Sequence, residues 1–290
     1  MMILIEVKNN IEQRLDDKIE SVRSITGGCI SDSSIIRLSS GKKYFLKVNP
    51  DVPKDMFTKE ANGLSEIARS KSIRVPVVKL VGEKFILMEC IEGNSKTKNI
   101  YEDFGISFAM MHKFEGTSFG FYEDNYIGST IQKNMPSDEE KNNWITFYFN
   151  KRLLFQFKLA EKNGYVDSLF RKYFNQIENK IELILRSENE KPCLLHGDLW
   201  AGNYIVDENG RACLLDPAVY YGNREADLAM TKIFGGFTNE FYKSYNEFYR
   251  LKDGYDFREN IYKLYHVMNH LNLFGSGYYQ QALSLMKFYL

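Results

Sequence analysis

The chain has 290 residues, with 38 basic and 38 acidic side chains and a formal net charge of zero. This balance gives no electrostatic basis for binding nucleic acid or an anionic membrane surface, and no stretch is long and apolar enough to predict a membrane span. A two-lobed enzyme with a small-molecule partner fits this length and charge.

The hydrophobic periodicity changes between the first third of the chain and the rest. The first third is predicted to form a helix (residues 11–20), three strands (22–26, 34–38 and 43–48), a helix after Pro53 and two strands (77–81 and 84–90). From Tyr101 onward the apolar spacing is mainly helical. The pattern predicts an α+β fold of two lobes. A small antiparallel-sheet lobe with helices (residues 1–91) would bind a nucleotide, and a mainly helical lobe (residues 92–290) would hold the catalytic and acceptor-binding residues.

Lys47 lies in a strand that is otherwise too apolar to accommodate an unpaired charge on its buried side. Nucleotide phosphates and the carboxylate of Glu60, on the following helix, are the predicted partners. The alternative is that Lys47 points to solvent from an edge strand.

The turn between the first two strands contains Gly27, Gly28 and Ser31, which are candidates for covering phosphates with backbone N–H and hydroxyl groups. Two glycines between strands are also typical of a simple turn. Cys29 in the same turn is a candidate redox switch or an inert filler.

The most informative segment runs from His196 to Asn203 and reads His-Gly-Asp-Leu-Trp-Ala-Gly-Asn. Short apolar strands precede and follow it, and the strand after the next turn ends at Asp216. In kinase-type sites an Asp in such a loop accepts the proton of the attacking hydroxyl, and an Asn and a later Asp hold Mg²⁺ against ATP phosphates. Asp198 is therefore the predicted base, and Asn203 and Asp216 are the predicted metal ligands. The alternative is a surface hairpin with ordinary turn residues.

Two further sets of residues have open interpretations. Asp227 either accepts N–H bonds from the loop that holds Asp198 or is an acidic residue favoured by a helix start. His266 and His270 have metal-chelating spacing, but apolar neighbours and the absence of a Glu after His266 favour packing. His112 is also expected to be structural.

The cysteines and the first residues predict the compartment. Cys29, Cys90, Cys193 and Cys213 form no C-x-x-C pair, as is typical of a reduced protein rather than a disulfide scaffold. The apolar run at the start has no basic region before it, so no secretory signal is expected. The expected location is cytoplasmic.

Together these motifs resemble the fructosamine kinase (ketosamine-3-kinase) family, whose fold is protein-kinase-like and similar to that of aminoglycoside phosphotransferases. The resemblance runs from about Thr26 to Gly275. It rests on residues 196–203, 216–230 and 234–237, on 124–130 with Gln132 and Asn134, and on 264–266 and 269–275.

The resemblance implies ATP- and Mg²⁺-dependent phosphorylation of the 3-hydroxyl of a ketosamine, free or protein-bound, whose product then eliminates phosphate and frees the amine. This would make the protein a deglycating enzyme, as a monomer or a homodimer. By resemblance, Asp198 is the base, Asn203 and Asp216 hold the metal, and Lys47 and Glu60 clamp phosphate. The implied adenine-facing strand is Met88, Glu89, Cys90 and Ile91, and the implied substrate contacts are Trp200, Asp124 and Asn125, with Trp200 alternatively a plug under the loop.

Two other functions fit parts of the sequence. One is another small-molecule kinase, acting on an aminoglycoside, choline or a thiosugar, although the mixed charge of the last segment gives no support to a polycationic acceptor. The other is a non-catalytic nucleotide-binding regulator, which would be expected to lack one of Lys47, Asp198, Asn203 and Asp216; all four are present. The chain departs from the family pattern at Asn223, in place of His, and at Ile131, in place of Pro, both near the expected substrate site.

Overall fold

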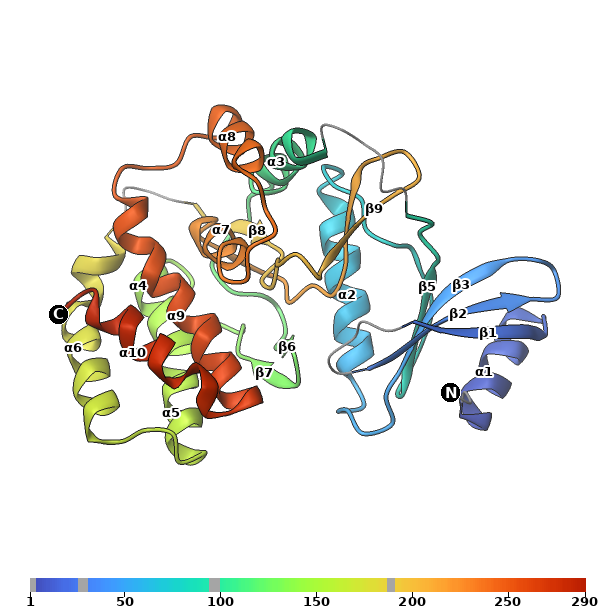
Figure 1. The fold of residues 1–290 in the computed structure, drawn as a ribbon, viewed down its shortest axis with the longest axis horizontal. Helices are drawn as coiled ribbons and strands as arrows, with labels where there is room; N and C mark the ends of the chain where they lie inside the picture. The colour runs from blue at the N-terminus through green and yellow to red at the C-terminus, as the bar shows by residue number, and fades with distance from the viewer. Residues whose placement is uncertain (1–3, 26–30, 94–99, 187–190) are drawn as a thin grey trace. The chain divides into compact units, whose positions relative to one another are not determined.

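The computed structural model describes residues 4–25, 31–93, 100–186 and 191–290. Contacts divide the chain into two compact units (Figure 1). Unit 1 comprises Met1–Ile100 and Tyr204–Asp216, and unit 2 comprises Tyr101–Asn203 and Pro217–Leu290. The first continuous stretch thus ends nine residues after the expected boundary at 91, and a hairpin from the expected second lobe belongs to unit 1.

Unit 1 contains a five-stranded antiparallel sheet in the order β1-β2-β3-β5-β4. Its strands are β1 (Ile19–Ile25), β2 (Asp32–Leu38), β3 (Lys43–Val48), β4 (Val78–Gly82) and β5 (Phe85–Glu89). The β3–β5 pairing places Lys47 opposite Ile86, in the middle of the sheet. The predicted antiparallel sheet is confirmed, and β3 is a central strand rather than an edge.

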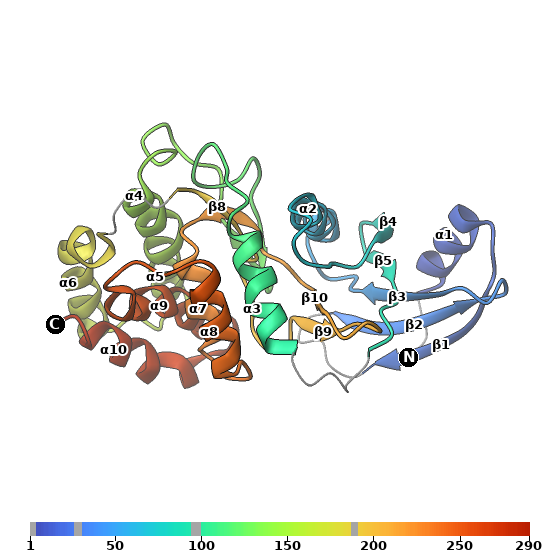
Figure 2. The same cartoon turned by 90° about the horizontal axis from the view of Figure 1, so that it is seen from above.

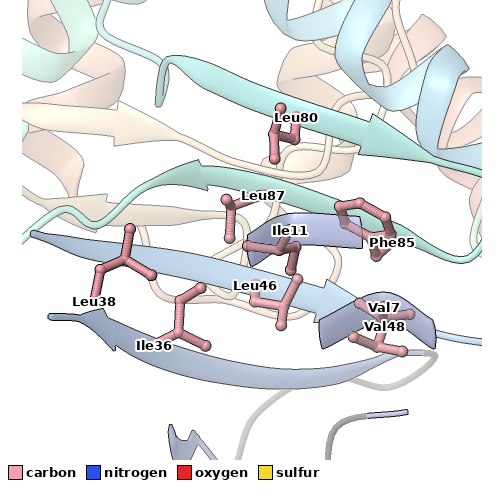
Figure 3. Close-up of a cluster of buried hydrophobic side chains, with 9 residues drawn as sticks. All are labelled: Val7, Ile11, Ile36, Leu38, Leu46, Val48, Leu80, Phe85 and Leu87. Atoms are coloured by element: carbon pink, nitrogen blue, oxygen red, sulfur yellow. The ribbon is translucent and has the colours of Figure 1, made fainter. Parts of the chain in front are cut away.

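Two helices cover the two faces of this sheet (Figure 1). α1 (Ile5–Leu15) places Val7 and Ile11 against strands β2, β3 and β5 (Figure 3). α2 (Met56–Arg69) places Phe57 and Leu64 against Ile86 and Met88. Successive residues of β5 therefore enter different cores, as the period of two in a strand requires.

The first helix differs from the prediction of residues 11–20. It begins at Ile5 and ends at Leu15, where Asp16 adopts a left-handed conformation with φ 51° and its N–H bonds the carbonyl of Glu12. The i, i+4 pair Val7 and Ile11 starts the buried stripe earlier than the sequence analysis placed it. Ile19 then opens a strand instead of a helical turn.

A hairpin distant in sequence completes unit 1 (Figure 2). Its strands are β9 (Tyr204–Val206) and β10 (Ala212–Leu214). Cys213 forms a parallel bridge with Arg74, and the Leu214 N–H donates to the Arg74 carbonyl at 2.9 Å. This pairing brings Asp216, two residues after β10, into unit 1.

Unit 2 is mainly helical, as predicted, and α9 (Tyr255–Phe274) is its longest helix and packs against α5, α6, α7 and α10. Two short hairpins or strand pairs accompany the helices: β6 (Asn125–Ile127) with β7 (Thr130–Gln132), and β8 (Cys193–Leu195) with β11 (Tyr220–Gly222). In the described ranges, no helix combines the length and the apolar character required to cross a membrane. The other helical segments are α3 (Ile100–Met111), α4 (Trp144–Tyr148), a π-helical segment (Phe149–Leu154), α5 (Phe155–Lys162), α6 (Ser168–Leu185), α7 (Glu225–Thr231), α8 (Asn239–Phe248), a 3-10 turn (Ser276–Tyr278) and α10 (Tyr279–Lys287).

Candidate active site

A buried lysine with two carboxylate partners forms the charged part of the site, in unit 1. The Lys47 ammonium donates to Glu60 Oε1 at 2.8 Å and also contacts Asp216 Oδ1. Lys47 is 9% exposed, so the alternative of a solvent-facing lysine is wrong. The predicted pairing of Lys47 with Glu60 is confirmed by this contact.

The two carboxylates keep Lys47 charged. Burial alone would lower the pKa of the ammonium, but the charges of Asp216 and Glu60 outweigh burial and raise that pKa above its ordinary value. A cation held in this way can neutralise phosphate oxygens without first losing or gaining a proton.

Asp216 has a backbone conformation that side chains other than glycine seldom adopt. Its φ is +53°, in the left-handed region, and it lies two residues after β10. Such strained residues persist only where the surrounding structure holds them, and they gather at functional sites. Its side chain is 47% exposed and still offers oxygen atoms to a ligand.

The loop that contains Asp198 is held in unit 2 by one buried carboxylate. Asp227, on α7, accepts the backbone N–H groups of His196 at 2.6 Å and Gly197 at 2.8 Å. The same carboxylate lies 3.2 Å from His112 Nε2, and His112 also pairs with the hydroxyl of Tyr245. The anchor interpretation of Asp227 and the structural interpretation of His112 are therefore confirmed.

These bonds keep Asp227 ionised. Burial would raise its pKa, but the interaction with His112 and the N–H bond from Gly197 outweigh burial and hold the pKa below its ordinary value. A buried carboxylate that accepts backbone N–H groups fixes the loop conformation before any substrate arrives.

Gly197 is required where it stands. Its φ is +83°, and a Cβ at this position would lie 2.0 Å from the Ala218 carbonyl oxygen. The backbone segments at Gly197 and Ala218 lie this close because they are hydrogen-bonded: the Ala218 N–H donates to the His196 carbonyl at 2.8 Å. The chain that enters the Asp198 loop is thereby bonded to the chain that follows Asp216 and Pro217.

Within the loop, Asn203 supports Asp198. The Asn203 amide nitrogen donates to the Asp198 carbonyl at 2.8 Å and lies 3.2 Å from Asp198 Oδ2. The Asn203 backbone N–H donates to the Trp200 carbonyl at 2.9 Å, which closes the turn between them. These two contacts engage the amide nitrogen, and the acceptor atom of an Asn side chain is its amide oxygen.

Helix α7 is fixed by contacts that the sequence analysis missed. Glu225 forms a two-bond ion pair with Arg258 of α9, at 2.6 and 2.7 Å, with both side chains buried. Arg224 donates to the carbonyls of Tyr249 and Arg250 and stacks over the Tyr249 ring. The sequence run Arg-Glu-Ala-Asp therefore contains three residues that hold one short helix and, through Asp227, the loop.

The indole ring of Trp200 packs against Gly202 in the same loop. A Cβ added to Gly202 would lie only 2.3 Å from Cη2 of this ring. The ring also makes an edge contact with Phe234, with the two ring centroids 6.0 Å apart. Trp200 is half-buried, and Phe234 is 42% exposed. An indole in this state packs on the loop and still presents apolar surface.

The expected substrate contacts Asp124 and Asn125 have internal partners. Asp124 accepts the N–H groups of Asn134 and Met135 and pairs with Lys133. Asn125 is 3% exposed, donates to the Val219 carbonyl at 2.8 Å and accepts from Gln132 and Asn134.

Asn125 therefore supports the chain at Val219, and its expected contact with a substrate stays a prediction. Asn223 is also buried, and its Oδ1 accepts the N–H of Glu225, the first residue of α7, at 2.9 Å.

The expected adenine-facing strand corresponds to the end of β5 and the residues after it. Met88 is buried in the core under α2, and the Glu89 N–H donates to the Val77 carbonyl. Cys90 and Ile91 follow β5 and are half-buried. Ser31 is half-buried at the entry to β2, whereas Gly27, Gly28 and Cys29 lie outside the described residues.

His266 and His270 pack, as expected, instead of forming a metal site. His266 is 3% exposed beside the Tyr265 ring, and His270 Nδ1 bonds the His266 carbonyl. Among the described residues, no group of three or more His, Cys, Asp or Glu side chains is placed to hold a metal ion. Carboxylate oxygens, phosphate oxygens and water are the donors that Mg²⁺ prefers.

Comparison with known proteins gives consistent results along the whole chain. A family model described as "Fructosamine kinase" matches residues 3–290. The chloroplastic protein-ribulosamine 3-kinase of Arabidopsis thaliana is 41% identical over 281 residues, which cover 94% of this chain and 83% of the relative. A crystal structure of a "Putative fructosamine-3-kinase" from Haemophilus somnus 129PT has a TM-score of 0.86 and 26% identity, and the match covers 98% of this chain and 96% of that one.

A more distant structure identifies the fold. An ADP-bound aminoglycoside phosphotransferase has a TM-score of 0.66 over 99% of both chains at 15% identity, a likeness of fold alone. The predicted two-lobed, protein-kinase-like fold is thus confirmed. With a family model that matches almost every residue and a relative 41% identical, the chain belongs to the fructosamine kinase family.

Proposed function

We propose that this protein transfers the γ-phosphoryl group of ATP to the 3-hydroxyl of a ketosamine, a ketose attached to an amine. The observation that carries the proposal is the Asp198 loop, held by two backbone bonds to buried Asp227 in a member of the fructosamine kinase family. The relative from Arabidopsis is named a protein-ribulosamine 3-kinase, and the related solved structure is described as a "Putative fructosamine-3-kinase".

The residues have separate tasks in this reaction. Asp198 accepts the proton of the 3-hydroxyl while the hydroxyl oxygen bonds to the γ-phosphorus and the bond to the ADP oxygen breaks. Lys47, oriented by Glu60, neutralises phosphate charge. Asn203 and Asp216 would hold Mg²⁺, which supplies further neutralisation of the phosphates when bound.

The contact between Lys47 and Asp216 bears on the metal. Asp216 offers its carboxylate to the ammonium in this structure, so a metal ion would share that carboxylate with Lys47. We therefore expect Mg²⁺ binding to depend on ATP, whose phosphates give Lys47 other acceptors.

The acceptor side is proposed from Trp200. A half-buried indole presents a flat face suited to the apolar edge of a sugar or to an amine-bearing arm. The 3-phosphorylated product is unstable and eliminates phosphate, which frees the amine and makes the reaction a deglycation. Ketosamines of free amines and of protein-bound amines both fit this chemistry. The cytoplasmic location and the monomeric or homodimeric state remain predictions from the sequence.

The experiment is Mg²⁺-dependent ADP release with ribulose-lysine, fructose-lysine and an aminoglycoside tested side by side. Turnover of either ketosamine, with a product that loses phosphate on standing, supports the proposal and ranks the sugars. Turnover of the aminoglycoside alone, or ATP binding without turnover of any acceptor, would contradict it.

A further inference from the structure

One arginine in unit 1 binds three carboxylates from two distant parts of the chain. The Arg74 guanidinium donates to Asp207 Oδ2 at 2.6 Å, to Glu208 Oε1 at 2.8 Å and to Glu89 Oε1 at 2.7 Å. Asp207 and Glu208 are more than 130 positions away from Arg74, and all four residues belong to unit 1. The function proposed above assigns no task to Arg74.

Each end of this cluster leads to a part of the candidate nucleotide site. Glu89 ends β5, where the backbone is proposed to face adenine, and its second oxygen accepts the Val77 N–H at 3.2 Å. Asp207 opens the turn between β9 and β10, and β10 leads directly to Asp216. The guanidinium is therefore a bridge between the adenine side and the metal side of unit 1.

The backbone of Arg74 makes a second connection. Its carbonyl accepts the N–H of Leu214 at 2.9 Å, two residues before Asp216. The side chain of Arg74 thus binds the turn of the β9–β10 hairpin, and its main chain binds the last residue of β10. An arginine fork can make several directed bonds at once, which a lysine ammonium on a flexible stem does less well.

Asp207 is the most constrained partner. Its side chain is 1% exposed, and its Oδ1 accepts the N–H groups of Asn209 at 2.9 Å and Arg211 at 2.8 Å. Burial would raise its pKa, but the Arg211 N–H and the Arg74 guanidinium outweigh burial and hold the pKa low. Asp207 therefore links the Arg74 guanidinium to the backbone of the turn between β9 and β10.

We propose that Arg74 is a positioning residue for the nucleotide site: by joining Glu89 to the β9–β10 hairpin, it sets where Asp216 stands relative to the adenine-facing end of β5. The inference rests on the proposed roles of that strand and of Asp216. It predicts that loss of Arg74 affects ATP and Mg²⁺ together, while acceptor binding in unit 2 is unaffected.

The test compares Arg74→Ala and Arg74→Lys with wild type. ATP affinity is measured by calorimetry at several Mg²⁺ concentrations, and KM for ATP and for the acceptor is measured separately. In Arg74→Ala we expect ATP affinity and half-saturating Mg²⁺ each to worsen about tenfold or more, with the acceptor KM within about twofold, since 10–100-fold losses follow removal of groups that support metal ligands. Arg74→Lys should recover part of the loss, because it keeps the charge without the fork.

Two further variants keep the test decisive if Arg74→Ala does not fold. Glu89→Gln removes the adenine-side charge and leaves the Asp207 bond, so ATP affinity should fall while thermal stability changes little. Arg171→Ala is the matched control, because its ion pair with Glu161 is exposed and lies in unit 2; it should change neither ATP nor Mg²⁺ affinity.

Unchanged ATP and Mg²⁺ affinity in Arg74→Ala, or unchanged ATP affinity in Glu89→Gln if Arg74→Ala does not fold, would overturn the inference. So would an equal loss in ATP, Mg²⁺ and acceptor parameters that simply follows the folded fraction. Because binding of ATP is measured without acceptor, a failure of the ketosamine assignment leaves this result readable.

Discussion

The candidate functional residues of unit 1 and those of unit 2 are held in place by different interactions. In unit 1, side-chain charges hold one another: Lys47 bonds Glu60 and Asp216, and Arg74 joins Glu89 of β5 to Asp207 in the turn of the β9–β10 hairpin. In unit 2, the Asp198 loop is held through its backbone, by N–H bonds to buried Asp227. Charge positions the residues of unit 1, and backbone hydrogen bonding positions those of unit 2.

Because of this difference, substitutions in unit 1 and in unit 2 should affect different properties of the protein. A charge removed from unit 1 leaves a buried partner without compensation and weakens ATP binding. A charge removed from Asp198 leaves the loop intact, because the loop is held by other residues. The following predictions test this separation, beginning with the largest effect.

Asp198→Asn should lower kcat by about 10²-fold to 10⁴-fold, because it removes general-base catalysis. The ATP dissociation constant should stay within about twofold, which calorimetry checks, because Asp198 is not part of the Lys47 cluster. Asp138→Asn is the matched control, since that side chain is 99% exposed on the surface. A comparable loss of ATP affinity in Asp198→Asn would contradict the assignment of separate tasks.

Lys47→Met should lower kcat/KM for ATP by about 10²-fold to 10³-fold, a loss typical of one electrostatic contact to a reacting group. Glu60 then lacks its cation and should take up a proton, because burial raises its pKa. The acceptor KM, measured at saturating ATP, should hardly move. Wild-type kcat/KM for ATP in this variant would show that the buried pair is purely structural.

Asp216→Asn should raise half-saturating Mg²⁺ about tenfold or more, with kcat partly restored at high Mg²⁺, since an amide is a weaker ligand than a carboxylate. Titration of ADP release with Mg²⁺ measures the effect. A kcat defect that excess Mg²⁺ does not relieve would argue against a metal-ligand role.

Asp227→Asn should lower the free energy of unfolding by about 1–3 kcal/mol. The two carboxylate oxygens each accept one buried N–H, and the substitution replaces one of these oxygens with an amide group that can only donate. Denaturant unfolding measures this loss of stability. We also expect kcat to fall, whereas the affinity for ATP should not change. The anchor account fails if this variant unfolds like wild type and retains full kcat.

The smallest effect at neutral pH concerns His266. Burial lowers its pKa to about 3, whereas the unfolded chain titrates near its ordinary value of 6.5. The unfolded state therefore binds more protons between these values, so stability should fall as pH drops below about 6.5, by at most about 1.4 kcal/mol per pH unit from this residue. His266→Leu should flatten this part of the pH profile measured by denaturant unfolding, and an unchanged slope would contradict the assignment.

Sequence reasoning reached residues whose chemistry is local or conspicuous. A lysine in an apolar strand, an acidic residue on the next helix and the His-Gly-Asp loop all carry signals within a few positions, and the Lys47–Glu60 pair and the Asp227 anchor follow from them. Arg74 carries no such signal, because its partners Asp207 and Glu208 are identified only by the fold.

Two other findings also depend on contacts between residues that are far apart in the sequence. The family resemblance implied a substrate contact for Asn125, and the structure shows that its amide also bonds the Val219 carbonyl and Gln132. The β9–β10 hairpin is joined to the rest of unit 1 by contacts of Arg74, among them its bridge with Cys213. Periodicity describes each strand by itself and does not reveal such a long-range pairing.

The most direct test of the account is phosphorus NMR of the products formed from ATP, Mg²⁺ and ribulose-lysine or fructose-lysine, with wild type and Asp198→Asn in parallel. The account predicts a ketosamine 3-phosphate that decays to inorganic phosphate and free amine with wild type, and at least a hundredfold less of it with Asp198→Asn. Wild-type protein that binds ATP but phosphorylates neither ketosamine would contradict the account, as would an Asp198→Asn variant that is as fast as wild type.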